Sequence, residues 1–142
     1  MTKVDFYLLS DSGSDPHYHF ACRLIEKAYR RQHRVFVLAS DQAMAETIDE
    51  LLWTFKDDSF IPHNLLGEGP NNPPPIQIGF GDIESPPSKD ILLNLSPTIP
   101  AYHNRFRRIF EIVTQDEAMK AHLREHYRYY KQADYGINTH KL

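Results

Sequence analysis

Cysteine is scarce in this sequence, because Cys22 is the only one among its 142 residues. A single thiol excludes an intrachain disulfide and any zinc site built from several cysteines. It fits a reducing compartment, in which free thiols persist. No evident base accompanies Cys22 in the sequence, so we expect a structural thiol and not a nucleophile.

Long apolar runs are missing as well. No stretch approaches the ~20 apolar residues that a helix needs to span a bilayer. The apolar start of the chain, from Val4 to Leu9, is too short for a signal peptide and is soon interrupted by Asp11. We therefore expect a soluble, cytoplasmic protein.

Glycine-rich phosphate motifs are a third absence. The sequence contains neither G-x-x-x-x-G-K-[ST] nor a G-x-G-x-x-G after its first apolar run. Such loops let the backbone approach phosphates closely. Two isolated G-x-G pairs occur at residues 67–69 and 79–81, and neither opens a predicted helix. We expect neither a bound nucleotide nor any other cofactor.

Positive charge is not in excess either. The formal net charge is -3, so no global field draws the protein onto DNA or anionic lipid. Apolar residues make up 41% and charged residues 25%, which argues against wholesale disorder. A chain of this length buries one core more readily than two, so we expect a single α/β domain over residues 1–142.

The first half of the chain alternates between strand and helix patterns. Residues 4–9 form a short run rich in β-forming residues, and helical spacing follows over 15–32. The continuous apolar run at 35–39 is typical of a strand covered on both faces, and a second helix follows over 41–56. This order predicts a parallel sheet with right-handed crossovers.

The second half begins less regularly. Proline is frequent between residues 59 and 75, where we predict an irregular surface segment, because proline lacks a backbone donor and restricts its predecessor. Strand patterns return at 76–80, at 91–95 and within 106–113, and a last helix is predicted over 115–132. Together the patterns predict a three-layer, Rossmann-like α/β fold with a mostly parallel sheet flanked by helices.

Metal ligation has two candidate groups. His122 and His126 lie four apart on the last predicted helix, a spacing that can seat one metal, but the sequence lacks the H-E-x-x-H glutamate. Two partly exposed surface histidines are the simpler interpretation. Asp11, Asp15 and Asp41 stand near predicted strand ends and could hold magnesium, although turn and cap roles explain all three. A magnesium-dependent phosphoryl-transfer enzyme using Asp11 and Asp15 is the alternative function.

Trp53 stands opposite the apolar stripe of its predicted helix. At ~100° per residue it lies about 180° from Met44. The stripe around Met44 contains Ile48, Leu51, Leu52 and Phe55. A tryptophan in this position either packs on another element or waits for a partner as an exposed hot spot. The sequence leaves both interpretations open.

The last predicted helix carries its cations on one side. The side between about 100° and 180° from its apolar centre holds Lys120, Arg124, Arg128 and Lys131, and Tyr127 lies at the apolar edge near ~80°. Like charges four residues apart cost about 0.2–0.5 kcal/mol each, so their grouping indicates an acidic partner. Arginine and tyrosine together suit a peptide carboxylate with an apolar anchor. A solvated face and direct DNA binding through this helix are the competing interpretations.

Several segments of the chain resemble the chi subunit family of DNA polymerase III. The stretch from Phe60 to Pro70 is the most specific, because it is long and unusual in composition. Other matching segments are Phe6–Leu9, Asp49–Trp53, Pro75–Ile78, Asp90–Leu95, Arg124–Tyr127 with Tyr130, and Asn138–Thr139. The resemblance implies a Rossmann-like fold without nucleotide binding and a non-catalytic, clamp-loader-associated role in DNA replication.

The resemblance also implies two partners. One is the psi subunit, and the other is the acidic, Pro-Phe-ended C-terminal tail of single-stranded-DNA-binding protein, so that DNA is reached only indirectly. The implied tail site consists of Trp53, Val113, Lys120, Arg124, Tyr127 and Arg128, and the implied psi surface of Phe60, Ile61 and Pro62. At Arg128 the family representative carries lysine, and arginine keeps the charge but changes the hydrogen-bond geometry. We therefore predict one cleft between Trp53 and the basic helix, and a separate surface around Phe60.

Overall fold

One parallel sheet runs through the part of the chain that the structure describes. The computed structural model describes residues 2–9, 14–56, 60–66, 74–81, 83, 90–114 and 116–141. Within these ranges the sheet has seven strands in the order β3-β4-β2-β5-β6-β1-β7, all parallel. Their bounds are β1 Lys3–Leu8, β2 Val35–Ala39, β3 His63–Leu65, β4 Ile76–Phe80, β5 Ile91–Asn94, β6 Arg108–Val113 and β7 Gly136–Lys141.

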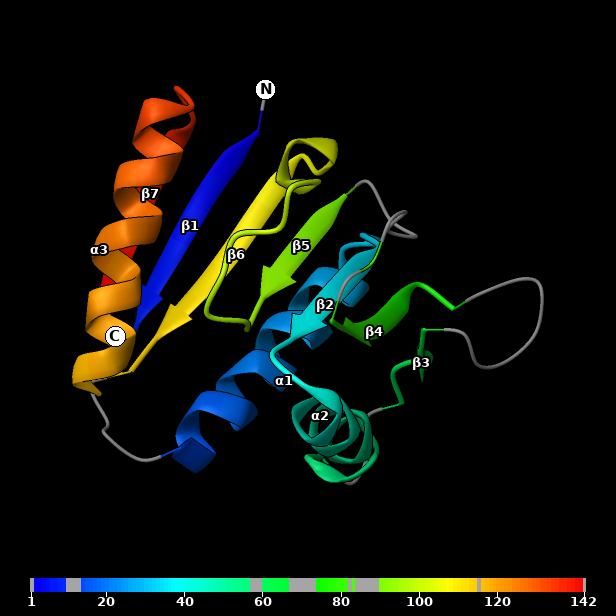
Figure 1. Ribbon diagram of the computed structural model, residues 1–142. Coiled ribbons are helices and arrows are strands. Elements are labelled where there is room, and N and C mark those ends of the chain that lie inside the picture. Colours follow the sequence, from blue (N-terminus) through cyan, green and yellow to red (C-terminus); the bar gives the residue numbers. More distant parts are fainter. Residues whose placement is uncertain are drawn as a thin grey trace.

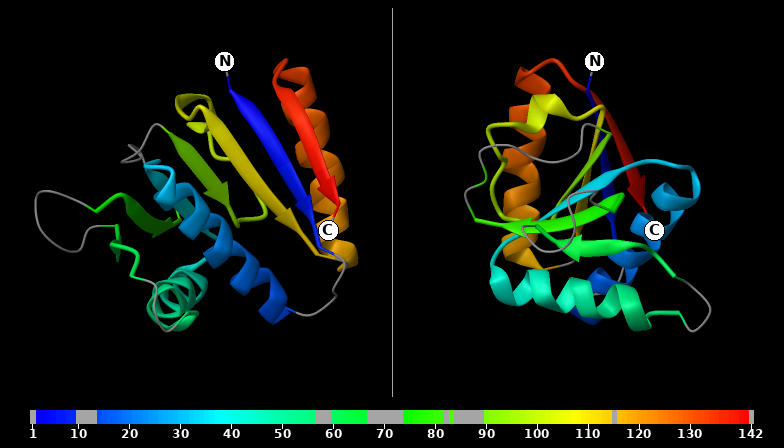
Figure 2. Two further views of the ribbon diagram at one scale, coloured as in Figure 1. Left: turned by 180° about the vertical axis from the view of Figure 1, so that it is seen from behind. Right: turned by 90° about the vertical axis from the view of Figure 1, so that its right-hand side faces the viewer.

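Helices lie on both faces of the sheet and make it the middle of three layers. α3 (Glu117–Gln132) covers one face, and α1 (Ser14–Arg30) and α2 (Gln42–Thr54) cover the other (Figure 1, Figure 2). A short 3-10 helix, η1 (His103–Arg105), precedes β6. None of the helices in the described ranges is long and apolar enough to cross a membrane.

Strand alternation divides the core into two apolar clusters. In β1, Val4 and Phe6 belong to the cluster under α3, whereas Tyr7 packs against the cluster under α1 and α2. Successive side chains of a strand point to opposite faces, so each strand contributes to both clusters. β2 is buried at every position, as a continuous apolar run predicts for a parallel strand covered on both faces.

Aspartate side chains cap the two helices that start near the site. Asp41 Oδ1 accepts a hydrogen bond from the amide of Met44 at 2.8 Å. Asp116 Oδ1 accepts one from the amide of Ala118, also at 2.8 Å. Each bond satisfies an amide that the first helical turn leaves unpaired. These caps fix where α2 and α3 begin at the carboxyl ends of the strands.

The predicted three-layer α/β fold is confirmed, but the sequence patterns miss two strands. β3 lies in the segment predicted to be irregular, because three residues that include His63 and Asn64 are too few to show a period. β7 is an edge strand whose side chains are mostly exposed, so no apolar face marks it in the sequence. Both strands extend the sheet at its edges and leave its predicted centre unchanged.

Candidate functional site

α3 presents two chemically different faces. His126 and Tyr130 are buried against the sheet, whereas Arg124, Arg128 and Lys131 are exposed. The helix starts beside the carboxyl ends of β1 and β6 and runs back along the sheet (Figure 1). The basic stripe predicted from the sequence therefore lies at the protein surface.

A pocket of about 170 Å³ lies where the first turns of α3 meet the ends of β1 and β6. We call it the cationic pocket, and it is lined by Leu8, Val113, Thr114, Lys120, Leu123 and Arg124. It brings together Val113, Lys120 and Arg124, three residues of the predicted tail site. Lys120 makes a 3.8 Å ion pair with the exposed Glu117, a contact worth little in water. An apolar floor with two cations at its rim suits an apolar side chain that carries a carboxylate.

Tyr127 and Arg128 continue this surface along α3. Tyr127 is exposed, and its ring centre lies 6.0 Å from that of the buried Phe6. The ammonium group of Lys131 stands 5.9 Å from the centre of the Tyr127 ring, within reach of a cation–π contact. Arg128 is exposed on the neighbouring turn. Five of the six predicted tail-site residues thus lie in or next to the cationic pocket on one side of the sheet.

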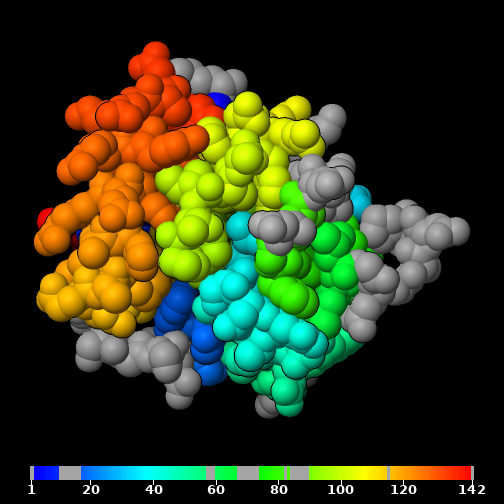
Figure 3. Space-filling view, in the orientation of Figure 1, coloured from blue at the N-terminus to red at the C-terminus, as the bar shows by residue number. Residues whose placement is uncertain are grey.

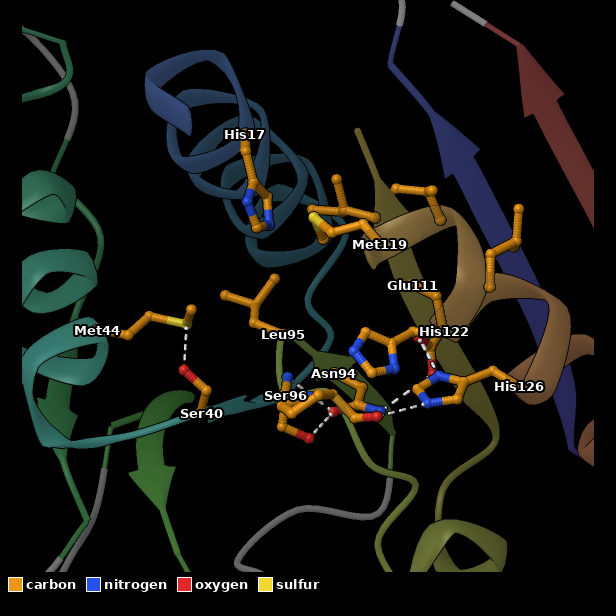
Figure 4. A pocket seen from close by; sticks show the side chains of 14 residues that line it. His17, Ser40, Met44, Asn94, Leu95, Ser96, Glu111, Met119, His122 and His126 are labelled. Atoms are coloured by element: carbon orange, nitrogen blue, oxygen red, sulfur yellow. Dashed lines mark hydrogen bonds and ion pairs between the residues drawn. The ribbon is translucent and has the colours of Figure 1, made fainter. Parts of the chain in front are cut away.

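A second pocket, of about 310 Å³, opens outside the carboxyl ends of β2, β5 and β6 (Figure 4). We call it the strand-end pocket. It shares Val113 and Leu123 with the cationic pocket, and most of its wall is apolar. The space-filling view shows a hollow between α3 and the start of α2 (Figure 3). Open α/β sheets commonly bind ligands at this position.

His17 reaches into the strand-end pocket from α1 (Figure 4). Its Nε2 atom is buried and has no hydrogen-bond partner among the described residues. Burial lowers the pKa of His17, so the ring is neutral near pH 7. Apolar side chains of Met44, Leu95 and Met119 stand around the same space. The pocket can therefore hold an apolar group, to which His17 Nε2 offers a buried polar contact.

Glu111 forms the hub of a buried network behind α3. His126 donates from Nδ1 to Glu111 Oε1 at 2.9 Å, and Tyr130 donates its hydroxyl to Oε2 at 2.6 Å. Asn94 donates from Nδ2 to the same Oε2 at 3.0 Å. His126 Nε2 donates to the carbonyl of Pro97 at 2.9 Å. The network ties α3 to β6, to β5 and to the loop after β5.

The electrostatics of this network follow from its geometry. Burial alone lowers the pKa of His126, but the hydrogen bond and charge of Glu111, with the Pro97 carbonyl, outweigh burial and raise it. Burial and the Glu111 charge raise the pKa of the Tyr130 hydroxyl, which stays protonated and donates. The only sign of this network in the sequence is a glutamate, Glu111, within the apolar run of β6. The sequence patterns did not predict the network.

The competing metal and nucleophile sites gain no support from the described residues. Both ring nitrogens of His126 are engaged, so His122 and His126 cannot jointly hold a metal in this arrangement. No group of three or more potential ligands is present in the described ranges. Asp41 caps α2, Asp11 lies outside the described residues, and the side chain of Asp15 is likewise not described. Cys22 is buried, and burial raises the pKa of its thiol to about 12.

The glycine pairs also have structural explanations where the structure describes them. Gly79 lies in β4, and a Cβ atom there would come within 2.7 Å of Ile83 and 2.9 Å of Phe36. Glycine at this position therefore permits close packing. Gly81 has a left-handed φ of 73°, which favours glycine. The pair at residues 67–69 lies outside the described residues.

Trp53 and Phe60 form a second exposed feature, which we call the aromatic patch. Trp53 is 52% exposed and Phe60 is 65% exposed, and their ring centres are 5.6 Å apart. The Trp53 ring also contacts buried His63 at 4.5 Å between centres. α2 and α3 lie on opposite faces of the sheet (Figure 2). The structure thus places Trp53 beside Phe60 of the predicted psi surface, and neither the cationic pocket nor the strand-end pocket contains Trp53, so a single cleft with the basic helix stays a prediction.

The predicted psi surface around Phe60 contains one buried residue, Ile61. Ile61 is 1% exposed and belongs to the apolar cluster under α1 and α2, so it cannot present its side chain to a partner. His63 holds the segment in place, because its ring nitrogens lie 2.7 Å and 2.9 Å from the carbonyl oxygens of Ile61 and Asp49. Pro62 is partly exposed. Ile61 therefore anchors the segment that displays Phe60.

Comparison with known proteins identifies a family. The family model described as DNA polymerase III chi subunit, HolC, matches residues 1–138. The DNA polymerase III subunit chi of Pseudomonas aeruginosa is 33% identical, over 100% of this chain and 98% of that protein. The subunit of Escherichia coli is 30% identical, over 98% and 97% of the two chains. That of Haemophilus influenzae is 31% identical, over 98% and 96%.

The structure has a parallel sheet between layers of helices, and the sequence has no phosphate-binding motif. These two features define the protein as a Rossmann-like α/β domain without a nucleotide-binding fingerprint. The family match then decides among the many families with such folds, because a fold alone does not give function. The chain belongs to the chi subunit family of DNA polymerase III, and its relatives are named as subunits of that replication polymerase.

Proposed function

We propose that this chain is a non-catalytic accessory subunit that links the psi subunit to the acidic C-terminal tail of single-stranded-DNA-binding protein. The cationic pocket carries the proposal, because it sets Lys120 and Arg124 beside an apolar floor. In this role the protein tethers the clamp loader to coated DNA in the cytoplasm. It contacts the tail and the psi subunit directly, and the tail supplies the link to DNA.

Tail binding uses apolar and charged contacts together. The floor around Val113 and Leu123 takes the terminal phenylalanine, and the Tyr127 ring extends that floor along α3. Arg124 takes a carboxylate with two parallel hydrogen bonds. Each charged contact contributes about 1–3 kcal/mol where it is partly desolvated and less at the rim. Binding therefore weakens as salt is raised.

Psi binding uses the aromatic patch. Large exposed aromatic side chains are the residues that most often dominate interface energies. Phe60 is the most exposed large apolar side chain among the described residues, and the buried Ile61 holds it in place. The contact between the Trp53 and Phe60 rings favours assigning Trp53 to this surface and not to the tail site.

A peptide titration tests the tail site. An acidic peptide ending in Pro-Phe is titrated into the wild-type protein and into Arg124→Ala and Tyr127→Ala. We expect each variant to bind about tenfold more weakly, as the loss of about 1.4 kcal/mol implies. Arg105→Ala removes an exposed arginine outside the site and is the matched control. Unchanged affinity in both site variants would overturn the assignment.

The psi surface needs its own test. Phe60→Ala is expected to lose psi binding in co-purification and to keep wild-type affinity for the tail peptide. A variant that loses both partners with an unchanged melting temperature would contradict two separate surfaces. Loss of neither partner would remove Phe60 from the psi surface.

A further inference from the structure

The sheet face behind β1 and β7 carries no described helix. α1 packs against β2 and β6. Seen from behind, α1 passes beside β1 and β7 and leaves most of these two strands without a helix over them, although Phe20 of α1 reaches Tyr7 (Figure 2). We call this area the open strip, and it consists of Lys3, Asp5 and Tyr7 of β1, Arg108 of β6, and Asn138 and His140 of β7.

Strand register places these residues on one side of the sheet. Lys3 is paired with Arg108, and Tyr7 is paired with His140. Paired residues of neighbouring parallel strands point to the same face, opposite to the buried Phe6. Polar side chains at alternate positions are typical of a sheet face that meets water or a polar partner. The polar side chains of the open strip therefore suit a surface that contacts water or a polar partner, and do not suit an apolar core.

Positive charge gathers along the open strip. Lys27, in the last turn of α1, and Arg31, which follows the helix, line a small pocket of about 70 Å³ together with Arg108 and Tyr7. Lys3, Lys27 and Arg31 are exposed, and none makes an ion pair with a described carboxylate. The chain as a whole has a net charge of -3, so the sign of this surface is opposite to that of the protein.

The one carboxylate of the open strip, that of Asp5, is buried and contacts Arg108 and His140. Asp5 Oδ2 lies 3.7 Å from the guanidinium Nε of Arg108. Asp5 Oδ1 accepts a hydrogen bond from His140 Nε2 at 3.1 Å. Asp5 thus lies beneath Arg108 and His140, with its Oδ2 making no hydrogen bond to a described residue, and an anion approaching from outside meets Arg108 first.

An aromatic stack stands beside these cations. The rings of Tyr7 and His140 are parallel within 15°, with centres 4.7 Å apart. The partly buried Phe20 of α1 packs on Tyr7, with ring centres 5.4 Å apart. β7 is an edge strand, so no described strand lies beyond His140, whose side chain is 43% exposed. A flat ring open on its outer side can stack with a nucleobase.

We propose that the open strip binds single-stranded nucleic acid, with Lys3, Lys27, Arg31 and Arg108 on the phosphates and His140 stacked on a base. Cations that follow the backbone next to an aromatic platform are the combination by which proteins hold single strands. A duplex keeps its bases stacked and offers none to the ring. An acidic peptide with apolar anchors finds only a pocket of about 70 Å³ here, against about 170 Å³ at the cationic pocket.

Fluorescence anisotropy with a labelled oligothymidylate tests the proposal. The Lys27→Ala/Arg31→Ala double variant changes only exposed positions at the end of α1, and a thermal melt verifies its folding. We expect its affinity to fall about tenfold. The slope of log K against log salt should become shallower by about 1.4, because each phosphate contact to a single strand contributes about 0.7. The matched control, Lys120→Ala/Arg124→Ala, removes the same charge from the tail site and should bind the oligonucleotide within twofold of wild type.

A third variant separates stacking from charge. His140→Ala is expected to weaken binding about fivefold or more with an unchanged salt slope, because base stacking is insensitive to salt. Absence of oligonucleotide binding by the wild-type protein at low salt would overturn the proposal. So would equal losses in the two double variants, which indicate general attraction. A Lys27→Ala/Arg31→Ala protein that keeps the oligonucleotide but loses the acidic peptide would assign the strip to peptide binding. The oligonucleotide results are independent of the acidic-peptide titration of Arg124→Ala, so failure of this proposal can be distinguished from failure of the tail site.

Discussion

His126 donates both of its ring N–H groups, one to Glu111 Oε1 at 2.9 Å and one to the Pro97 carbonyl at 2.9 Å. The Pro97 carbonyl can only accept, so Nε2 carries a proton, and the ionised carboxylate of Glu111 favours a second proton on Nδ1, which makes His126 an imidazolium. The pair is a buried ion pair, because both side chains are less than a tenth exposed. It positions α3 on the sheet, and the tail site depends on that position.

The raised pKa of His126 gives the protein a stability that depends on pH. A histidine whose pKa is higher in the folded state than its ordinary value near 6.5 stabilises the fold fully below that value. The contribution is lost as pH rises through the folded-state pKa, and each unit of increase is worth about 1.4 kcal/mol. We expect the free energy of unfolding, measured in urea, to fall over this range.

His126→Gln is the control for this dependence. Burial lowers the pKa of His17 and of His103, and these groups contribute with the opposite sign. The difference between wild type and variant therefore isolates His126. A difference that stays constant with pH would show that His126 is not the titrating group.

Removal of the Glu111 charge should be severe. Glu111→Gln leaves a buried cation without its counter-ion, and breaking such a pair costs about 3–5 kcal/mol. The loss is measured by urea unfolding below about pH 6, where His126 is charged in both states. Glu117→Gln, at an exposed position of the same helix, should cost less than about 0.5 kcal/mol. Equal stability of the two variants would contradict the role of the network.

The position of Trp53 makes a prediction about partner choice. Its ring lies against Phe60, so Trp53→Ala should weaken psi binding and leave the tail peptide within about twofold of wild type. A double-mutant cycle with Phe60→Ala should give a non-additive loss, because residues in contact couple by about 0.5–3 kcal/mol. A large loss of tail affinity in Trp53→Ala would instead support the single cleft expected from the sequence.

Cys22 should be inert in the folded protein. Burial raises the pKa of its thiol to about 12, so the reactive thiolate is rare near neutral pH, and the side chain is covered. We expect a thiol-specific reagent to label it slowly in buffer and rapidly in urea. Fast labelling without denaturant would show that α1 opens readily around this residue.

The spacing of apolar residues in the sequence predicts the strands and helices that bury a regular apolar face. The apolar run at residues 35–39 and the helical stripe around Ile48 indicated a buried strand and an amphipathic helix, and the structure contains both. Val113, Lys120 and Arg124 were predicted from the family resemblance, and the structure gathers them at one pocket.

Local patterns in the sequence could not predict contacts between segments that are distant along the chain. Whether Trp53 met α3 or Phe60 depended on how the proline-rich segment folds back on α2, and no local period records that. Ile61 shows the same limit, because an apolar residue next to proline reads equally well as a contact or as an anchor. Its burial follows only from the tertiary structure.

The most direct test of the central claim is tail affinity measured with and without bound psi. Calorimetric titration of the acidic peptide is carried out on the free protein and on its complex with the psi subunit. The cationic pocket is lined by residues of β1, β6 and α3 and the residue after β6, whereas the aromatic patch consists of Trp53 of α2 and Phe60, so we predict equal affinities within about twofold and a ternary complex. Displacement of the peptide by psi, or a peptide affinity that psi binding abolishes, would contradict a subunit that bridges two partners.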